Sequence, residues 1–171
     1  MRRILVVGIS GAGKSRFARA VAARRSLPYH EMDALALGPN WSTPVDFEAT
    51  IDRITQEPAW VFDSYGYAAV RDLLWSRADT VLWLDYPRRI TWPRMLRRSV
   101  HRTITQAEIF NGNRETLRSW FSADHPVWHA WRDHAARRAY LQARTAEPRF
   151  AHLAVVRFRR PEQAANFLGT L

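Results

Sequence analysis

The sequence has no cysteine, and only one of its 171 residues is a lysine. Without cysteine the chain can form neither disulfide bonds nor thiolate metal sites, and it suits the reducing environment of the cytoplasm. No apolar run approaches the ~20 residues that a membrane-spanning helix needs. Only Met1, Arg2 and Arg3 precede the first apolar run, which leaves no room for a signal peptide. We therefore expect a cytoplasmic protein that has no membrane partner.

The composition is typical of one compact domain. Hydrophobic residues make up 47% of the chain, which is enough to build a core. No internal repeat, low-complexity tract or long linker divides the sequence. We therefore expect a single domain over residues 1–171, and the sequence leaves the oligomeric state open.

The one lysine, Lys14, lies in a recognisable motif. The segment Gly8-Ile9-Ser10-Gly11-Ala12-Gly13-Lys14-Ser15 matches G-x-x-x-x-G-K-[ST] at every position. Arginine, which occurs 25 times, supplies positive charge almost everywhere else. In such a loop, backbone N–H groups surround nucleotide phosphates, and glycines let the backbone come close. The compact ammonium group of lysine can follow a phosphoryl group as it moves, whereas a planar guanidinium does not fit that space.

The flanking residues supply the strand and the helix that a phosphate-binding loop requires. Ile4–Val7 is a short apolar run typical of a buried parallel strand, and Arg16–Ala23 has apolar residues at helical spacing. Phosphates would then lie at the positive end of a helix dipole. The alternative is a glycine-rich turn that binds nothing. We expect ATP or another nucleoside triphosphate, with the Ser15 hydroxyl on Mg²⁺, to bind at Gly8, Ile9, Ser10, Gly11, Ala12, Gly13, Lys14, Ser15 and Arg16.

The rest of the chain alternates between predicted strands and predicted helices. After the first strand, we expect strands over residues 28–33, 60–63, 80–85 and 152–158. We expect loops over 34–44 and 103–113, and helices over 46–56, 70–77, 90–102, from near 114, 127–144 and from Pro161 onward. This alternation predicts an α/β fold with a parallel sheet, whose ligands bind at the carboxyl ends of strands. Gly8, Asp33, Asp63 and Asp85 fall at such ends.

Several segments together resemble the small adenylate-kinase-related P-loop proteins, many of which are labelled topology modulation proteins. Besides the P-loop, the resemblance rests on Asp33 with Gly38-Pro39-Asn40-Trp41, on Trp60–Asp63, on Arg77–Pro87 and on Asn111–Glu115. It covers most of the chain. It implies a nucleoside-monophosphate-kinase-like three-layer fold, with a five-stranded parallel sheet and a short, mobile, arginine-rich lid at about residues 94–118.

The chain departs from true adenylate kinases in its acceptor motif. Where they have Asp-Gly-Phe-Pro-Arg, this sequence has Asp63-Ser64-Tyr65-Gly66. Its lid is also short. Both differences argue against AMP as the acceptor.

Positive charge is concentrated around the expected lid. Residues 88–138 contain 11 arginines and four carboxylates. Arg94 and Arg98 are four residues apart, as are Arg114 and Arg118, so each pair is expected to share a helix face. Arginines that converge on a triphosphate stabilise the charge of phosphoryl transfer. We expect the first pair to bind nucleotide and the second to act in catalysis; the alternative is a solvated basic surface or a nucleic-acid patch.

Carboxylates at strand ends are the candidates for the acceptor and metal sites. We expect Asp33 to be the base or the anchor for an acceptor hydroxyl, assisted by Glu31 on the same strand face. The alternative for Asp33 is a helix cap or a loop hydrogen bond. Asp63 is expected to orient water bound to Mg²⁺. Asp85 can do the same, although its place before Tyr86 and Pro87 also suits a simple turn.

Three functions are compatible with these features. The favoured one is an ATP- and Mg²⁺-dependent kinase that phosphorylates a small-molecule acceptor. A narrower version is a nucleoside or nucleoside monophosphate kinase. The third is a P-loop ATPase or nucleotide-binding regulator whose basic surface contacts nucleic acid. The sequence does not name the acceptor, because its pocket is expected to come from loops 34–44 and 64–70, which carry no recognisable code.

Overall fold

The structure is a computed structural model, and it describes residues 1–114, 117–122 and 125–171. Of residues 118, 119, 126 and 129 it describes the backbone alone. Within these ranges, no helix is long and apolar enough to cross a membrane.

A five-stranded sheet forms the centre of the molecule. Its strands are paired in the order β2-β3-β1-β4-β7, and every pair is parallel. This confirms the predicted α/β fold with a five-stranded parallel sheet. The strands are β1 (Arg3–Gly8), β2 (Tyr29–His30), β3 (Trp60–Phe62), β4 (Thr80–Leu84) and β7 (Ala154–Phe158).

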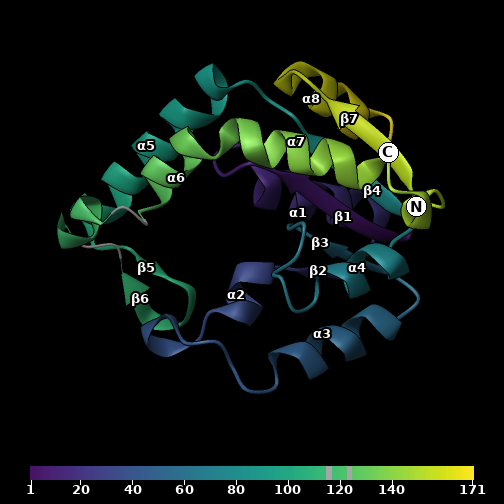
Figure 1. The fold of residues 1–171 in the computed structure, drawn as a ribbon, viewed down its shortest axis with the longest axis horizontal. Helices are drawn as coiled ribbons and strands as arrows, with labels where there is room; N and C mark the ends of the chain where they lie inside the picture. Colours follow the sequence, from purple (N-terminus) through teal and green to yellow (C-terminus); the bar gives the residue numbers. More distant parts are fainter. Residues whose placement is uncertain (115–116, 123–124) are drawn as a thin grey trace.

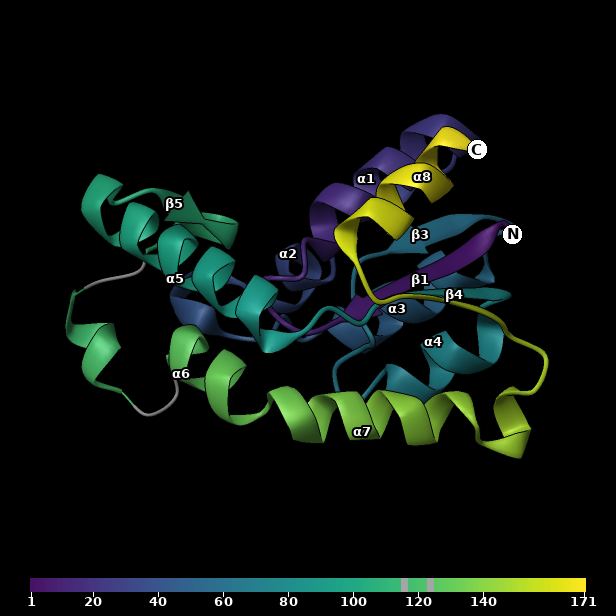
Figure 2. The ribbon, with the colours of Figure 1, turned by 90° about the horizontal axis from the view of Figure 1, so that it is seen from above.

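Helices cover both faces of the sheet and give three layers (Figures 1 and 2). On one face lie α1 (Lys14–Arg25) and α8 (Pro161–Gly169). On the other lie α3 (Phe47–Gln56), α4 (Arg71–Arg77) and α7 (His134–Thr145). Successive residues of a strand point to opposite faces. Ile4 and Val6 therefore pack toward α1, whereas Leu5 and Val7 pack toward the other helices.

The remaining elements lie beyond the carboxyl edge of the sheet (Figure 2). They are α2 (Met32–Ala36), α5 (Arg88–Thr105), the hairpin of β5 (Glu108–Ile109) and β6 (Asn113–Arg114), a 3-10 helix at Leu117–Phe121, and α6 (Pro126–Arg132). Short 3-10 helices also occur at Pro39–Trp41, Phe110–Gly112 and Pro148–Phe150. α5 and α6 share a small apolar cluster of Met95, Val127 and Ala130. The packing of α5 on α6 is thus separate from the two layers on the sheet, whereas α2 packs into the sheet core through Met32 and Ala36.

The second strand is shorter than the predicted range of residues 28–33. β2 contains only Tyr29 and His30, and the chain turns into α2 at Met32. The turn has a physical cause, because the Met32 backbone N–H donates to the Asp63 carboxylate at 3.0 Å instead of continuing the ladder. Asp33 therefore lies in the first turn of α2 and not at a strand end. The loop predicted for residues 34–44 was wrong in part, since α2 continues to Ala36 and a 3-10 turn follows.

Two helix predictions also differ from the structure. The helix predicted over residues 127–144 is two helices, divided at Asp133, because α6 packs on α5 while α7 packs on the sheet layer. The helix predicted from near Arg114 does not begin there, since Arg114 is in β6 and pairs with Glu108. Arg114 and Arg118 therefore do not share a helix face. By contrast, Arg94 and Arg98 both lie within α5, as predicted.

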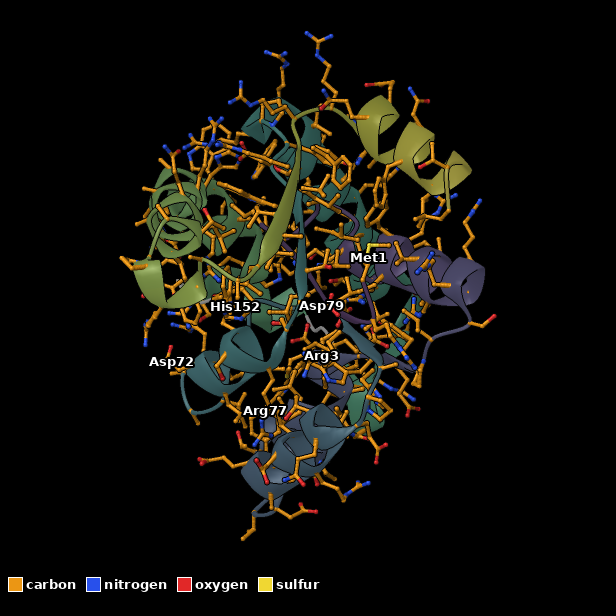
Figure 3. The ribbon with its side chains drawn as sticks, turned by 90° about the vertical axis from the view of Figure 1, so that its right-hand side faces the viewer. Met1, Arg3, Asp72, Arg77, Asp79 and His152 are labelled. Atoms are coloured by element: carbon orange, nitrogen blue, oxygen red, sulfur yellow. The ribbon has the colours of Figure 1, made fainter. Side chains whose placement is uncertain are left out.

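At the amino edge of the sheet, Asp79 lies beside the first residues of the chain (Figure 3). Asp79 accepts hydrogen bonds from the backbone N–H groups of Arg2 and Arg3, each at 2.9 Å, and lies 3.7 Å from the amino group of Met1. Burial acts to raise the pKa of Asp79, but the Thr80 hydroxyl together with these donors holds it below its usual value. This edge is held together by contacts within the chain.

Candidate active site

The P-loop connects the carboxyl end of β1 to the first turn of α1. Gly11 adopts φ +82°, and a side chain there would run into the backbone carbonyl of Thr91 in α5. The loop is closed by a hydrogen bond from the Ala12 N–H to the Ile9 carbonyl at 3.2 Å. Gly13, at φ +89°, directly precedes α1, so the free N–H groups of the first helical turn face the loop. Both the motif and its predicted flanks are thus present.

Lys14 lies in a poorly solvated part of this loop. Its ammonium group donates to the Ile9 carbonyl at 3.3 Å. Burial lowers the pKa of Lys14 to about 8, and the nearby carboxylates of Asp33 and Asp63 oppose the shift. The positive charges of Arg98 and Arg137 lower the pKa further. A phosphate placed here would meet an ammonium group that has few other partners.

A cavity of about 330 Å³, which we call the central cavity, adjoins the P-loop. Gly8, Ser10 and Lys14 of the P-loop line it, together with Asp33 and Asp63. The rest of the wall comes from residues 64–68, Arg71 and Arg137. The structure therefore brings the P-loop lysine and both predicted carboxylates to one cavity, although β1, α2 and β3 each supply a different part.

Asp33 has an exposed carboxylate with one identified donor among the described residues. The Tyr67 hydroxyl donates to its Oδ1 at 3.0 Å. Burial and the charge of Asp33 raise the pKa of Tyr67, so this hydroxyl keeps its proton. No donor to the second oxygen of Asp33 is found among the described residues. Glu31, predicted to assist Asp33 from the same strand face, instead forms an ion pair with Arg19 at 2.8 Å.

Asp63 is buried and both of its oxygens have donors. Oδ2 accepts from the Tyr29 hydroxyl and Oδ1 from the Met32 N–H, both at 3.0 Å. These bonds connect the end of β3 to the start of α2. Asp63 therefore fixes the segment that carries Asp33, and it also lines the central cavity.

Asp85, at the end of β4, belongs to a different environment. Its carboxylate is held by Arg157 at 2.7 Å and by Arg138 at 3.0 Å. Arg157 also lies over the ring of Trp83, 4.1 Å from its centre. Asp85 does not line the central cavity. Its two cations give it a structural role between β4, β7 and α7.

The predicted arginines are distributed over different places. Arg94 lines a second cavity of about 430 Å³ between α1 and α8, together with Arg16, Tyr86 and Pro161. Arg98 acts electrostatically on Lys14 and also contacts the sulfur of Met95 at 2.8 Å. Arg114 is exposed on β6. The side chain of Arg118 and residue Glu115 lie outside the described residues.

Two cavity arginines were missed by the sequence analysis. Arg71, at the start of α4, donates to the Gly66 carbonyl at 3.1 Å and to the Tyr140 hydroxyl at 3.2 Å. Arg137 reaches the same cavity from α7. Arg137 belongs to the basic segment of residues 88–138, but nothing in that segment distinguishes it from ten other arginines. Only the packing of α7 across the sheet brings it to the P-loop.

The sequence matches no protein-family model and no curated protein sequence. Its fold, however, matches solved structures. Shikimate kinase from Acinetobacter baumannii in complex with shikimate is similar over 99% of this chain and 92% of that chain, with a TM-score of 0.57 and 16% identity. A sugar kinase from Janibacter is similar over 99% of this chain and 93% of that chain, with a TM-score of 0.49 and 19% identity. Deoxyadenosine kinase from M. mycoides with bound dCTP is similar over 98% of this chain and 99% of that chain, with a TM-score of 0.49 and 10% identity.

These neighbours are P-loop kinases of small molecules. The chain has a P-loop-kinase-like fold. At 16% identity the match to the shikimate kinase extends to the fold alone. The assignment of a reaction therefore depends on the cavity described above.

Proposed function

We propose that the protein is an ATP- and Mg²⁺-dependent phosphotransferase that acts on a small-molecule acceptor. The central cavity supports this proposal, because Lys14 of the P-loop and Asp33 both line one space of about 330 Å³. A volume of this order suits a small ligand. An ATPase transfers the phosphoryl group to water, so it does not require space for an acceptor beside its nucleotide site.

The nucleotide would lie along the P-loop. Its phosphates meet the backbone of residues 8–13, Lys14 and the N-terminus of α1, and its nucleoside lies toward the cavity of about 430 Å³ lined by Arg16 and Arg94. In this arrangement Arg98 approaches the phosphates from α5. We also propose that Arg114 and Arg118 act on the transferred group when the basic segment closes over the nucleotide.

The residues present fit Mg²⁺ bound together with nucleotide phosphates. The Ser15 hydroxyl, in the first turn of α1, and the Asp63 carboxylate are hard oxygen donors of the kind that Mg²⁺ prefers. Asp63 already accepts two hydrogen bonds, so it suits contact through a bound water. When bound, Mg²⁺ would neutralise part of the phosphate charge.

Asp33 would hold the acceptor hydroxyl and accept its proton. The Tyr67 hydroxyl fixes one carboxylate oxygen, which leaves the other directed to the acceptor. Lys14 would lie where charge develops as the phosphoryl group moves. The groups on both sides of the cavity thus have complementary roles in phosphoryl transfer.

An acceptor screen that follows ADP release tests this function directly. We expect ADP formation that depends on an acceptor and on Mg²⁺, with little turnover when no acceptor is added. Arg114→Ala and Arg118→Ala should lower kcat more than they weaken ATP binding, if both residues act mainly in the transition state. Steady ATP hydrolysis that no acceptor stimulates, together with salt-sensitive nucleic-acid binding, would support a regulator instead.

A further inference from the structure

Two arginines of the central cavity, Arg71 and Arg137, form no ion pair with a carboxylate among the described residues, although Asp133 also lines the neighbouring cavity. Arg71 donates only to neutral groups, the Gly66 carbonyl and the Tyr140 hydroxyl. Arg137 lies over the ring of Tyr65, 4.7 Å from its centre, and forms no ion pair there. Burial lowers the pKa of Arg137, so a positive charge at this place is costly without an anion.

A third cavity adjoins these arginines on the outside. It has a volume of about 280 Å³ and is more open, and Tyr65, Arg71 and Arg137 line both it and the central cavity. These three side chains therefore form the boundary between the two spaces. An acceptor with its reactive hydroxyl at Asp33 would extend toward this boundary with its other end.

We propose that the acceptor carries an anionic group, a carboxylate or a phosphate, separate from the hydroxyl that is phosphorylated, and that Arg71 and Arg137 bind it. This inference rests on the proposed function and names the substrate class for the same site. A guanidinium can donate two parallel hydrogen bonds to either anion. Arg71 also lies over Tyr65 and Tyr140, at 5.0 and 5.3 Å from the ring centres, which fixes its orientation before a ligand arrives.

Neutral acceptors fit this site poorly. A sugar or nucleoside that filled the cavity would remove water from both guanidinium groups and supply no charge in return. The two carboxylates of the cavity do not replace the missing anion. Asp63 accepts from Tyr29 and Met32, and Asp33 accepts from Tyr67.

Arg137 has a competing role, because its charge also reaches Lys14 and can act on the phosphoryl group of ATP. Arg71 is held at the boundary with the third cavity by its bonds to the Gly66 carbonyl and the Tyr140 hydroxyl. A subsite for the acceptor requires both arginines, whereas contact with ATP requires only Arg137. The two variants therefore separate the two roles.

Calorimetric titration with inorganic phosphate tests the proposal without knowledge of the acceptor. The protein is first saturated with Mg²⁺ and a non-hydrolysable ATP analogue, so that the P-loop is filled. We expect one further phosphate to bind, and Arg71→Gln and Arg137→Gln each to weaken it at least ~10-fold, the loss of a charge-assisted pair. Arg149→Gln is the matched control, since Arg149 is exposed and forms its ion pairs with Asp72 and Glu147. A parallel titration with acetate distinguishes a carboxylate subsite from a phosphate subsite.

Each outcome decides the matter. Absence of binding by both probes, or binding that both variants retain, would overturn the proposal. Loss in only one of the two variants would also overturn it, and loss in Arg137→Gln alone would assign Arg137 to the ATP phosphates. The proposed function is measured separately, from the affinity for the ATP analogue and from acceptor-dependent ADP release, so the kinase can stand while the anionic acceptor fails.

Discussion

The two edges of the sheet use the same residue types in opposite ways. At the amino edge, Asp79 is bound by the first residues of the chain (Figure 3). Beyond it, Asp72 forms ion pairs with Arg144 and Arg149. At the carboxyl edge, Lys14, Arg71 and Arg137 face a cavity. The charges at the first edge are paired within the chain, whereas Arg71 and Arg137 at the second edge form no ion pair among the described residues.

The same contrast exists between two aspartates at the carboxyl edge. Asp85 is buried and bound by Arg138 and Arg157, whereas Asp33 is exposed and accepts one hydrogen bond from Tyr67. The position after a strand is therefore not enough to mark a functional carboxylate. What distinguishes the two is the number of cations that neighbouring elements bring to each, here α7 and β7 for Asp85.

The largest effect is expected for Lys14→Ala, which removes the central charge of the carboxyl edge. We expect acceptor-dependent turnover to fall by ~10³-fold or more, since Lys14 meets the phosphates, while the fold persists. Steady-state ADP release and circular dichroism measure the two effects. Arg149→Ala, which changes a paired arginine away from the cavity, should keep wild-type turnover. Turnover by Lys14→Ala within about tenfold of wild type would rule out the kinase.

A smaller loss is expected for Asp33→Asn, which keeps the shape of the side chain but removes the base. We expect kcat to fall by roughly 10²-fold, or the acceptor KM to rise, while ATP affinity is unchanged. Asp85→Asn is the comparison and should lower the free energy of unfolding by about 1–2 kcal/mol, because Arg138 and Arg157 would lose their anion. Normal kcat together with normal acceptor KM in Asp33→Asn would reduce Asp33 to a loop residue.

The pKa of Lys14 predicts a pH dependence of nucleotide binding. The free protein loses this charge as the pH rises above about 8, whereas bound phosphates favour the charged form. The affinity for the ATP analogue should therefore be highest and constant well below pH 8, and it should weaken by up to ~10-fold per pH unit above pH 8. Titrations of the ATP analogue at pH 7, 8, 9 and 9.5 measure this change. Lys14→Ala should show no such slope, and a slope that persists in it would point to another group.

The smallest effect is expected where the hairpin contacts the acceptor side. Asn111 donates to the carbonyls of Ala34 and Leu37, at 3.2 and 2.6 Å, and so connects the β5–β6 hairpin to α2. Asn111→Ala should raise the acceptor KM or lower kcat by about 3–10-fold through loss of this hydrogen-bonded contact. Thr145→Ala, which removes an exposed hydroxyl in α7, should change neither constant. Equal kinetics in both variants would show that the hairpin does not position Asp33.

The P-loop part of the candidate site could be predicted from the sequence because its residues are adjacent along the chain. Eight consecutive residues form the P-loop, and the strand and helix beside them have clear periodicity, so the motif and its context are specified by neighbours along the chain. The five-stranded parallel sheet followed from the alternation of strands and helices. In each case a short segment carries the whole signal.

Tertiary structure alone decided the acceptor half. Asp33 lies in a helix because the Met32 N–H, at the start of α2, donates to the carboxylate of Asp63, which follows β3. Arg71 and Arg137 come from α4 and α7, which are 66 positions apart, and only their packing on one face of the sheet brings them to the same cavity. In the same way, Asp85 was neutralised by arginines 53 and 72 positions away. The sequence by itself determined the P-loop with its strand and helix, since these are built from adjacent residues; which charged side chains share a cavity and which are paired depends on contacts between distant elements, which no local pattern records.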